Sequence, residues 1–177
     1  SLAIDSNDNL YVTYYDWSNG NLEYMSYDNS TSSWSTPVSL DNSTTGNSSI
    51  LGWSPSLAID SNDNLRVTYY DETNGDLRYG EFATTAASGN QTEESGWEIQ
   101  TIDSNPTTSH VIGNYNDLAV DELGTPHISY IAPPTTTGAA NYMLNYTYLD
   151  GESWITNNVV NSNGRSCIAL DSWGVPN

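Results

Sequence analysis

The sequence of 177 residues predicts an all-β fold, and three observations favour it. A segment of sixteen residues occurs twice, at 1–16 and at 56–71, and the two copies differ only in having Tyr11 or Arg66 at the same place. Short runs of β-branched and aromatic residues alternate with turns rich in Asn, Asp, Ser and Gly. No stretch shows a sustained helical period, so we expect strands throughout.

The repeat has a length that is typical of propeller blades. Weaker copies begin at Leu118 and Ile168, which occupy the position of Leu2 and Leu57. Successive copies are therefore offset by 55, 61 and 50 residues. Such periods are typical of propellers and other arrays, not of short-repeat solenoids. The sequence thus predicts a β-propeller of four-stranded antiparallel blades.

The first two strands of each repeat have distinct signatures. The first is a short apolar run, at 2–4, 57–59 and 118–120, and a turn rich in Asp, Asn, Ser or Gly follows it. The second is β-branched and aromatic, as at 10–15, with the period-2 alternation of a half-buried strand.

The second half of each repeat predicts a hairpin and two more strands. Asn19-Gly20 and Asn74-Gly75 tolerate the positive φ angles of a tight hairpin. A Leu-x-Tyr motif marks the third strand, and a Trp precedes the fourth. The tryptophans in question are Trp34, Trp97 and Trp154.

We expect a single propeller region over 1–177, with blades at 1–55, 56–116 and 117–166 and the start of another at 167–177. Propellers typically close with about 4–8 blades. The predicted propeller is therefore partial, and its ring would be completed by chain outside this sequence or by oligomerisation, because terminal blades otherwise present uncovered faces.

The repeat reads Leu-Ala-Ile-Asp, a turn, Leu-x-Val-Thr-Tyr-Tyr-Asp, then Asn-Gly-x-Leu-x-Tyr and a Trp. Over essentially the whole chain this pattern resembles the blade repeat of secreted microbial β-propellers of the sialidase-like or lectin-like kind. The resemblance implies the propeller fold, whereas activity is left open because propellers host many unrelated functions.

Two features depart from true sialidases. Their Asp-box has the form Ser-x-Asp-x-Gly-x-Thr-Trp, whereas residues 6–10 lack the Gly and the Trp and fall at a different hairpin. Sialidases also share an arginine triad that clamps the substrate carboxylate. Arg66 and Arg78 lie on neighbouring strands of one blade, and their positions do not predict convergence with Arg165. These departures disfavour sialidase activity.

Charge excludes several kinds of partner. Three basic residues, all arginine, stand against 22 acidic ones, which gives a formal net charge of −19. Nucleic acid is disfavoured because its binding relies on neutralising phosphates with Lys and Arg. Anionic membrane surfaces are disfavoured likewise, and no apolar run is long enough to span a bilayer. High acidity suits salty surroundings, so we expect a secreted or cell-surface protein.

Cysteine and glycosylation signals add little to this assignment. Cys167 is the single cysteine, so no disulfide can form within the chain. A chain rich in Asn, Ser and Thr produces glycosylation sequons by chance. The five sequons that could carry glycans are at Asn29, Asn42, Asn47, Asn90 and Asn145.

Aspartates recur at fixed places in the repeat. They are Asp5, Asp60, Asp121 and Asp171 after the first strand, and Asp16 and Asp71 after the second. Two carboxylates at a suitable separation can hydrolyse glycosides. An active site normally occurs once, however, so we expect each aspartate to accept hydrogen bonds from backbone N–H groups of its own turn.

Cofactor and catalytic signals are weak. The run at 5–9 offers oxygen atoms that calcium could bind, but it lacks the length and terminal Glu of an EF-hand loop, so a polar turn is the preferred interpretation. His110 and His127 have no zinc-site spacing with Cys167, and no nucleophilic triad is recognisable. We therefore assign no catalytic residues and expect no cofactor, with calcium as the alternative.

Several aromatic residues stand outside the strand pattern, in turns or inter-blade loops. In propellers, the loops before the first strand and between the second and third strands emerge on one face, and exposed rings there can stack on sugars while polar groups fix the hydroxyls. A Trp near a loop can alternatively just fill a gap between blades. The ligand-binding residues predicted on this loop face are Asp16, Trp17, Trp53, Asp71, His110, Asn114, Tyr115 and Arg165.

We expect a non-catalytic, extracellular or surface propeller that recognises glycans or another extracellular protein through this loop face. Self-association that completes the ring is an expected further interaction. Two alternatives remain open. One is a sialidase-like hydrolase whose catalytic blades lie outside these residues, and the other is a structural spacer of a large surface protein.

Overall fold

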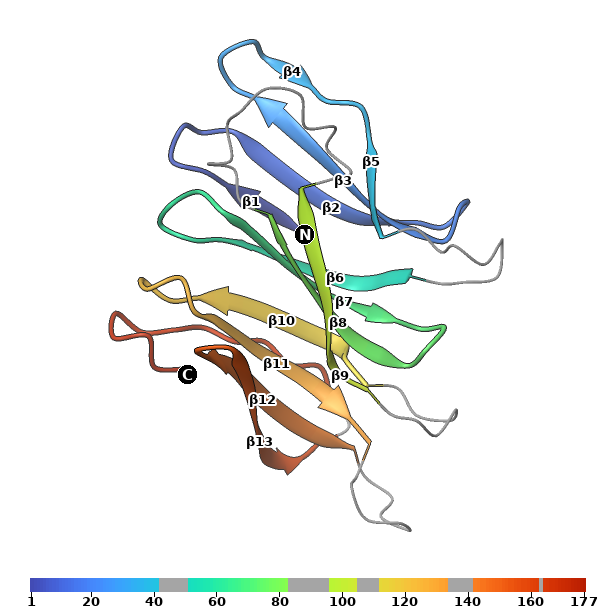
Figure 1. Ribbon diagram of the computed structural model, residues 1–177, viewed down its shortest axis with the longest axis vertical. Coiled ribbons are helices and arrows are strands. Elements are labelled where there is room, and N and C mark those ends of the chain that lie inside the picture. The colour runs from blue at the N-terminus through green and yellow to red at the C-terminus, as the bar shows by residue number, and fades with distance from the viewer. Residues whose placement is uncertain (42–50, 83–95, 105–111, 134–141, 163) are drawn as a thin grey trace.

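The computed structural model describes residues 1–41, 51–82, 96–104, 112–133, 142–162 and 164–177. All regular secondary structure in these residues is β, and it forms three antiparallel sheets. Figure 1 shows the sheets stacked in sequence order along the long axis of the molecule. The predicted all-β, propeller-type fold is confirmed.

Each sheet contains one copy of the repeat. The first holds β1 (Leu2–Ile4), β2 (Leu10–Asp16), β3 (Asn21–Asp28), β4 (Ser33–Trp34) and β5 (Val38–Asp41). The second holds β6 (Leu51–Ile59), β7 (Leu65–Asp71), β8 (Asp76–Phe82) and β9 (Trp97–Asp103). The third holds β10 (Asn114–Val120), β11 (Pro126–Ala132), β12 (Met143–Asp150) and β13 (Ser153–Asn161). Beyond it, an isolated bridge joins Leu170 to Pro176.

The predicted fourth strand of the first repeat is divided in two. β4 and β5 both pair with β3, and the segment 35–37 between them is not in the ladder. Pro37 lies in this gap, and proline has no N–H to give to a neighbouring strand. The first sheet therefore has five strands where four were expected.

The first strands of the second and third repeats begin earlier than predicted, and both contain a bulge. β6 starts at Leu51 and β10 at Asn114, and the register of each shifts near its start. Gly52 and Gly113 have φ angles of 96° and 92°, and a Cβ atom on either would lie 2.5 or 2.7 Å from the Cβ of Leu22 or Leu77 in the preceding sheet. Glycine is needed at both positions, because only a bare backbone can approach so closely with this φ.

Two apolar clusters hold the sheets together. One lies between the first and second sheets and includes Leu22, Tyr24, Leu57 and Val67. The other lies between the second and third sheets and includes Leu77, Tyr79, Leu118, Ile128 and Tyr130. Each cluster takes side chains from facing sheets, as expected for blades that pack face to face.

Hydrogen bonds at the repeated Leu or Ile position link successive sheets. The Leu57 N–H donates to the Ser1 hydroxyl (3.1 Å), and the Leu118 N–H donates to the Ser56 hydroxyl (3.1 Å). The Ile168 N–H donates to the Asp117 carboxylate (2.9 Å). In each case the acceptor directly precedes the first apolar residue of one repeat copy (Leu2, Leu57 or Leu118), and the donor is that apolar residue in the next copy. The same contact therefore recurs at all three junctions.

A tyrosine on the second strand forms another recurring link. The Tyr130 hydroxyl donates to the Asp103 carboxylate at 2.7 Å, and Tyr69 donates likewise to Asp41. Both tyrosines are fully buried. Their aspartates end the last strand of the preceding sheet, so the bond joins the middle of one sheet to the edge of the one before it.

The described residues form no helix that is long and apolar enough to cross a membrane.

Candidate functional site

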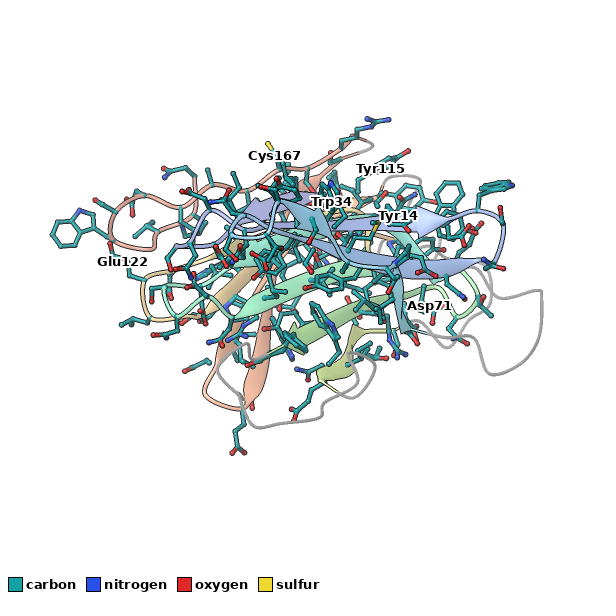
Figure 2. The ribbon with its side chains drawn as sticks, turned by 90° about the horizontal axis from the view of Figure 1, so that it is seen from above. Tyr14, Trp34, Asp71, Tyr115, Glu122 and Cys167 are labelled. Atoms are coloured by element: carbon teal, nitrogen blue, oxygen red, sulfur yellow. The ribbon has the colours of Figure 1, made fainter. Side chains whose placement is uncertain are left out.

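Two opposite edges of the sheets are distinguished by their loops. Figure 1 shows the β2–β3 and β7–β8 hairpins at the right and the turns that follow the first strands at the left. Asp71 and Glu122, which belong to these two kinds of loop, lie at opposite ends of the molecule in Figure 2. Of the residues predicted on the loop face, Asp16 and Trp17 lie at the β2–β3 hairpin and Asp71 at the β7–β8 hairpin.

An exposed aromatic cluster lies on the hairpin edge between the first two sheets. Trp17 and Trp53 have ring centroids 6.2 Å apart, and the Tyr15 ring lies 6.0 Å from Trp17 and 5.8 Å from Trp53. Trp17 is 75% exposed and Trp53 is 37% exposed. We call Tyr15, Trp17 and Trp53 the aromatic cluster. It presents ring surface to solvent at a place where two sheets meet.

Local geometry explains how these rings come together. Trp17 is the first residue of the four-residue loop between β2 and β3, which Gly20 closes at φ 73° with an N–H bond to the Asp16 carbonyl. Trp53 follows Gly52 in the β6 bulge, which lies against Leu22 at the start of β3. The bulge therefore brings Trp53 of the second sheet beside the hairpin of the first.

The two predicted hairpin aspartates accept hydrogen bonds from residues of their own turns. The Asp16 carboxylate accepts bonds from the Ser18 N–H (2.8 Å) and the Asn19 side chain, and the bond from Asn19 contributes most to lowering the pKa of Asp16. Asp71 accepts bonds from the backbone and the side chain of Asn74, and only 1% of its surface is exposed. In these positions the aspartates shape the hairpins through hydrogen bonds within their own turns.

A cavity of about 300 Å³ lies next to the aromatic cluster along the first strands. Ser54 and Pro55, which follow Trp53 in β6, line one part of it, and Tyr115 and Arg165 line another. The Arg165 guanidinium lies over the Tyr115 ring, 5.2 Å from its centroid, and the Ser166 hydroxyl donates to the Tyr115 carbonyl at 2.7 Å. Figure 2 shows Tyr115 and Cys167 on the same side of the stacked sheets.

The predicted loop-face residues are thus only partly gathered. Trp17 and Trp53 meet in the aromatic cluster, while Tyr115 and Arg165 meet at the cavity. The Asn114 side chain accepts a bond from the next backbone N–H, that of Tyr115. His110 lies outside the described residues.

Sequence reasoning did not select Tyr15 or the cavity-lining Ser54 and Pro55. Tyr15 could have been found, because it lies two residues before Trp17, beside the predicted hairpin loop. The two others depend on the β6 bulge, which has no clear signal in the sequence.

The aspartates that follow the first strands act as the sequence predicts. Asp5 accepts bonds from the N–H groups of Asn7 and Asn9, both at 2.8 Å, and from the Asn9 side chain and the Tyr11 hydroxyl. Burial alone would raise the pKa of Asp5, but these hydrogen bonds lower it overall. Asp60, Asp121 and Asp171 accept equivalent backbone bonds in their own turns.

The three arginines have three separate sets of partners. Arg66 is buried and pairs with Asp60 (3.2 Å) and Glu81 (3.0 Å). Arg78 lies near Asp41 at 3.6 Å and donates to the Thr101 hydroxyl at 3.1 Å. With Arg165 over Tyr115, no arginine triad of the sialidase kind forms among the described residues. No group of three His, Cys, Asp or Glu side chains there could hold a metal ion.

The structure describes two of the five predicted sequons. Asn29 is exposed in the turn after β3. Asn145 is only 6% exposed within β12, and this burial argues against a glycan at that position in the folded chain. Asn42, Asn47 and Asn90 lie outside the described residues.

Comparison in sequence finds no relatives. No protein-family model matches the chain, and no curated protein matches it.

Comparison in structure does find similar folds. A polysaccharide lyase of family PL25, an ulvan lyase, is similar with a TM-score of 0.63 and 16% identity over 93% of this chain. A fucose lectin from Kordia zhangzhouensis in complex with methyl-fucoside has a TM-score of 0.50 and 16% identity, and the match covers 91% of this chain and 98% of the lectin. A NanB sialidase from Streptococcus pneumoniae has a TM-score of 0.51 and 15% identity over 95% of this chain.

These likenesses differ in how much of the other protein they cover. The chain spans 44% of the lyase and 25% of the sialidase. At such low identities the similarity concerns the fold alone.

Proposed function

We propose that this chain is a non-catalytic, extracellular or surface propeller module that binds glycans through the aromatic cluster. The observation that carries the proposal is the exposure of the Trp17 and Trp53 rings beside Tyr15. Sugar rings have apolar C–H surfaces that pack on aromatic faces, and the cluster at the junction of two sheets offers three such rings in mutual contact. Tyr and Trp side chains have only two rotatable bonds, so they bind with a small loss of conformational entropy.

Charge favours neutral glycans over acidic ones. The chain has a net charge of −19, and two of its three arginines are engaged in ion pairs with aspartate or glutamate. An anionic sugar would meet repulsion without a matching cation cluster in the described residues. We therefore propose neutral saccharides as the ligand class.

The structural neighbours support a role with carbohydrates. They include a lectin in complex with a methyl-fucoside, a polysaccharide lyase and a sialidase. A propeller-type fold is therefore compatible with both sugar binding and sugar cleavage. Because the chain spans less than half of the lyase and of the sialidase, a glycan-cleaving enzyme completed by residues outside this sequence is the second candidate. Release of a reporter group from aryl glycosides by the purified chain would favour that candidate.

A comparison of tryptophan variants on a glycan array tests the proposed site. We expect Trp53→Ala to weaken the binding of the best neutral glycan by about tenfold, ~1.4 kcal/mol, because a stacked ring is lost from the cluster. Trp17→Ala should act in the same direction. Binding to the same glycan is then measured by titration calorimetry.

Trp173→Ala is the matched control. Trp173 is 87% exposed, but it lies in the turn of the fourth copy, at the opposite kind of loop from the aromatic cluster. Its removal should leave glycan affinity unchanged. Equal affinity of Trp53→Ala and the unmodified chain would refute the proposed site.

A further inference from the structure

A second aromatic pocket lies between the first two sheets, at the edge opposite to the aromatic cluster. It has a volume of about 240 Å³, and its lining includes Tyr11, Tyr24, Phe82, Trp97 and Asp28. Tyr11 stands near the start of β2 and Asp28 at the end of β3, whereas Trp17 follows the other end of β2. We call it the edge pocket. Its volume is below the roughly 300–1,000 Å³ of pockets for drug-sized ligands, so it suits a single ring.

The walls of the edge pocket are fixed by contacts within the core. The Tyr11 and Tyr24 rings stack with centroids 6.2 Å apart and planes inclined by 17°. Trp97 of the second sheet packs edge-on against Tyr24 at 6.0 Å and lies 5.4 Å from Phe82. The Tyr11 hydroxyl donates to Asp5 at 2.9 Å, which orients this ring. The pocket is therefore formed before any ligand arrives.

The sixteen-residue repeat contains an internal comparison for this pocket. Its two copies differ at one place only, where the first has Tyr11 and the second has Arg66. Between the second and third sheets, the Arg66 guanidinium lies between Asp60 and Glu81 and is 7% exposed. Glu81 stands at the repeat position of Ser26, another residue that lines the edge pocket. The one difference between the copies thus falls at a pocket wall in the first copy and at a buried arginine with two acidic partners in the second.

The polar groups of the edge pocket suit sugar hydroxyls. Asp28 accepts bonds from Ser30 and from the Thr31 N–H, and all of them end on Oδ1. A carboxylate has about four lone-pair sites, so the exposed Asp28 carboxylate can accept a further bond from a ligand hydroxyl. A carboxylate in a chain of net charge −19 repels anionic ligands, so the chemistry points to an uncharged ring with one apolar face.

We propose that the edge pocket binds one neutral sugar ring and is a second saccharide site, separate from the aromatic cluster. The ring packs on the Tyr11 and Trp97 side chains, and a hydroxyl of the sugar donates to Asp28. The two sites share no residue, so each can exist without the other.

Indole N–H signals in ¹H–¹⁵N spectra can test the two sites separately, because the chain has six tryptophans that report from different places. The probes are methyl β-galactoside, methyl α-mannoside and methyl α-fucoside, and the Trp97 signal is assigned with Trp97→Phe. We expect at least one probe to shift the Trp97 signal. In the double variant Tyr11→Arg/Ser26→Glu, which introduces the Arg66–Glu81 pair of the second copy, half-saturation should need about tenfold more probe or more.

Tyr14→Phe is the control, because Tyr14 lies on the same strand as Tyr11 but does not line the edge pocket. It should bind with an affinity close to that of the unmodified chain. A Trp97 signal that no probe shifts overturns the edge pocket, and so does a shift that persists undiminished in the double variant. Movement of the Trp17 and Trp53 signals alone would overturn the edge pocket but leave the proposed function standing. Movement of Trp97 alone would contradict the aromatic cluster and support the pocket.

Discussion

One aspartate organises each turn that follows a first strand, and Asp60 illustrates how. It accepts bonds from the Asn62 and Asn64 N–H groups at 2.9 Å each, from the Asn64 side chain and from Arg66. Burial alone would raise the pKa of Asp60, but the hydrogen bonds from Asn64 and Asn62 and the charge of Arg66 lower it overall. A carboxylate whose pKa is lowered on folding stabilises the folded chain above its unfolded pKa of about 3.9.

We therefore predict that Asp60→Asn reduces the free energy of unfolding at pH 7 by about 2–3 kcal/mol, because charged hydrogen bonds are lost beside a buried guanidinium. The difference from the unmodified chain should shrink as the pH falls below about 4, where Asp60 itself becomes protonated. Urea denaturation at several pH values measures both effects. Asp8→Asn is the control, since its carboxylate forms no hydrogen bond among the described residues, and its effect should stay within about 0.5 kcal/mol. A loss that did not depend on pH would contradict this explanation.

The role of a single residue could be predicted where it depends only on residues a few positions away in the sequence. The bonding of Asp5 and Asp60 within their own turns follows from residue types a few positions apart. The burial of Asp71 could not be predicted in this way. Asp71 has the same repeat position as Asp16, which is less buried, and the difference depends on what packs around the second sheet.

The segments that form strands could be predicted from the sequence, but the bulges in those strands could not. The period-2 alternation of residues 10–15 predicts β2, and the Asn-Gly turn predicts the hairpin that follows it. Both signals depend only on residues close together in the sequence. Trp53, Asn114 and Tyr115 were expected in loops, but they lie in the bulged strands β6 and β10. The bulges depend on glycines pressed against Leu22 and Leu77 of another sheet, and the repeat pattern alone does not reveal that contact.

The hydrogen bond from the second strand of one sheet to the last strand of the preceding sheet can be tested by removing a single tyrosine hydroxyl. We predict that Tyr130→Phe lowers the free energy of unfolding by about 1–3 kcal/mol, because the Asp103 carboxylate loses a buried donor at 2.7 Å. Tyr14→Phe is the matched control at the same repeat position, and the Tyr14 hydroxyl forms no hydrogen bond with the described residues. Its effect should stay within about 0.5 kcal/mol. Equal losses in both variants would show that the hydroxyl bond does not link the sheets.

The burial of nearly identical strands shows how the whole molecule is arranged. Every residue of β7 is buried, whereas β2, which differs from it only at Tyr11, is mostly half-buried. The sheet of β7 lies between two described sheets, whereas the sheet of β2 has a described neighbour on one side only. In the same way Leu57 is 6% exposed and its counterpart Leu2 is 57% exposed. These uncovered apolar residues are the reason to expect that further blades or a second copy of the chain cover the first sheet. This expectation is still a prediction.

This difference between equivalent residues is measurable in the isolated chain. We predict that Leu57→Ser lowers the free energy of unfolding by about 3 kcal/mol or more, since a buried leucine is lost and a hydroxyl is left between two sheets. Leu2→Ser should cost less than about 1 kcal/mol, because Leu2 is already exposed. Urea denaturation of both variants gives the comparison. A large loss in Leu2→Ser would mean that the outer face of the first sheet is covered, for example by self-association, in the chain as purified.

The proposed function depends most on the binding of neutral saccharides by this acidic chain. A glycan array that holds neutral glycans beside sialylated, uronic and sulfated ones, probed with the unmodified chain at low salt, tests it directly. We predict binding to neutral glycans and none to the anionic ones, because repulsion from a net charge of −19 is largest at low ionic strength. Binding restricted to anionic glycans, or no binding to any glycan, would contradict it.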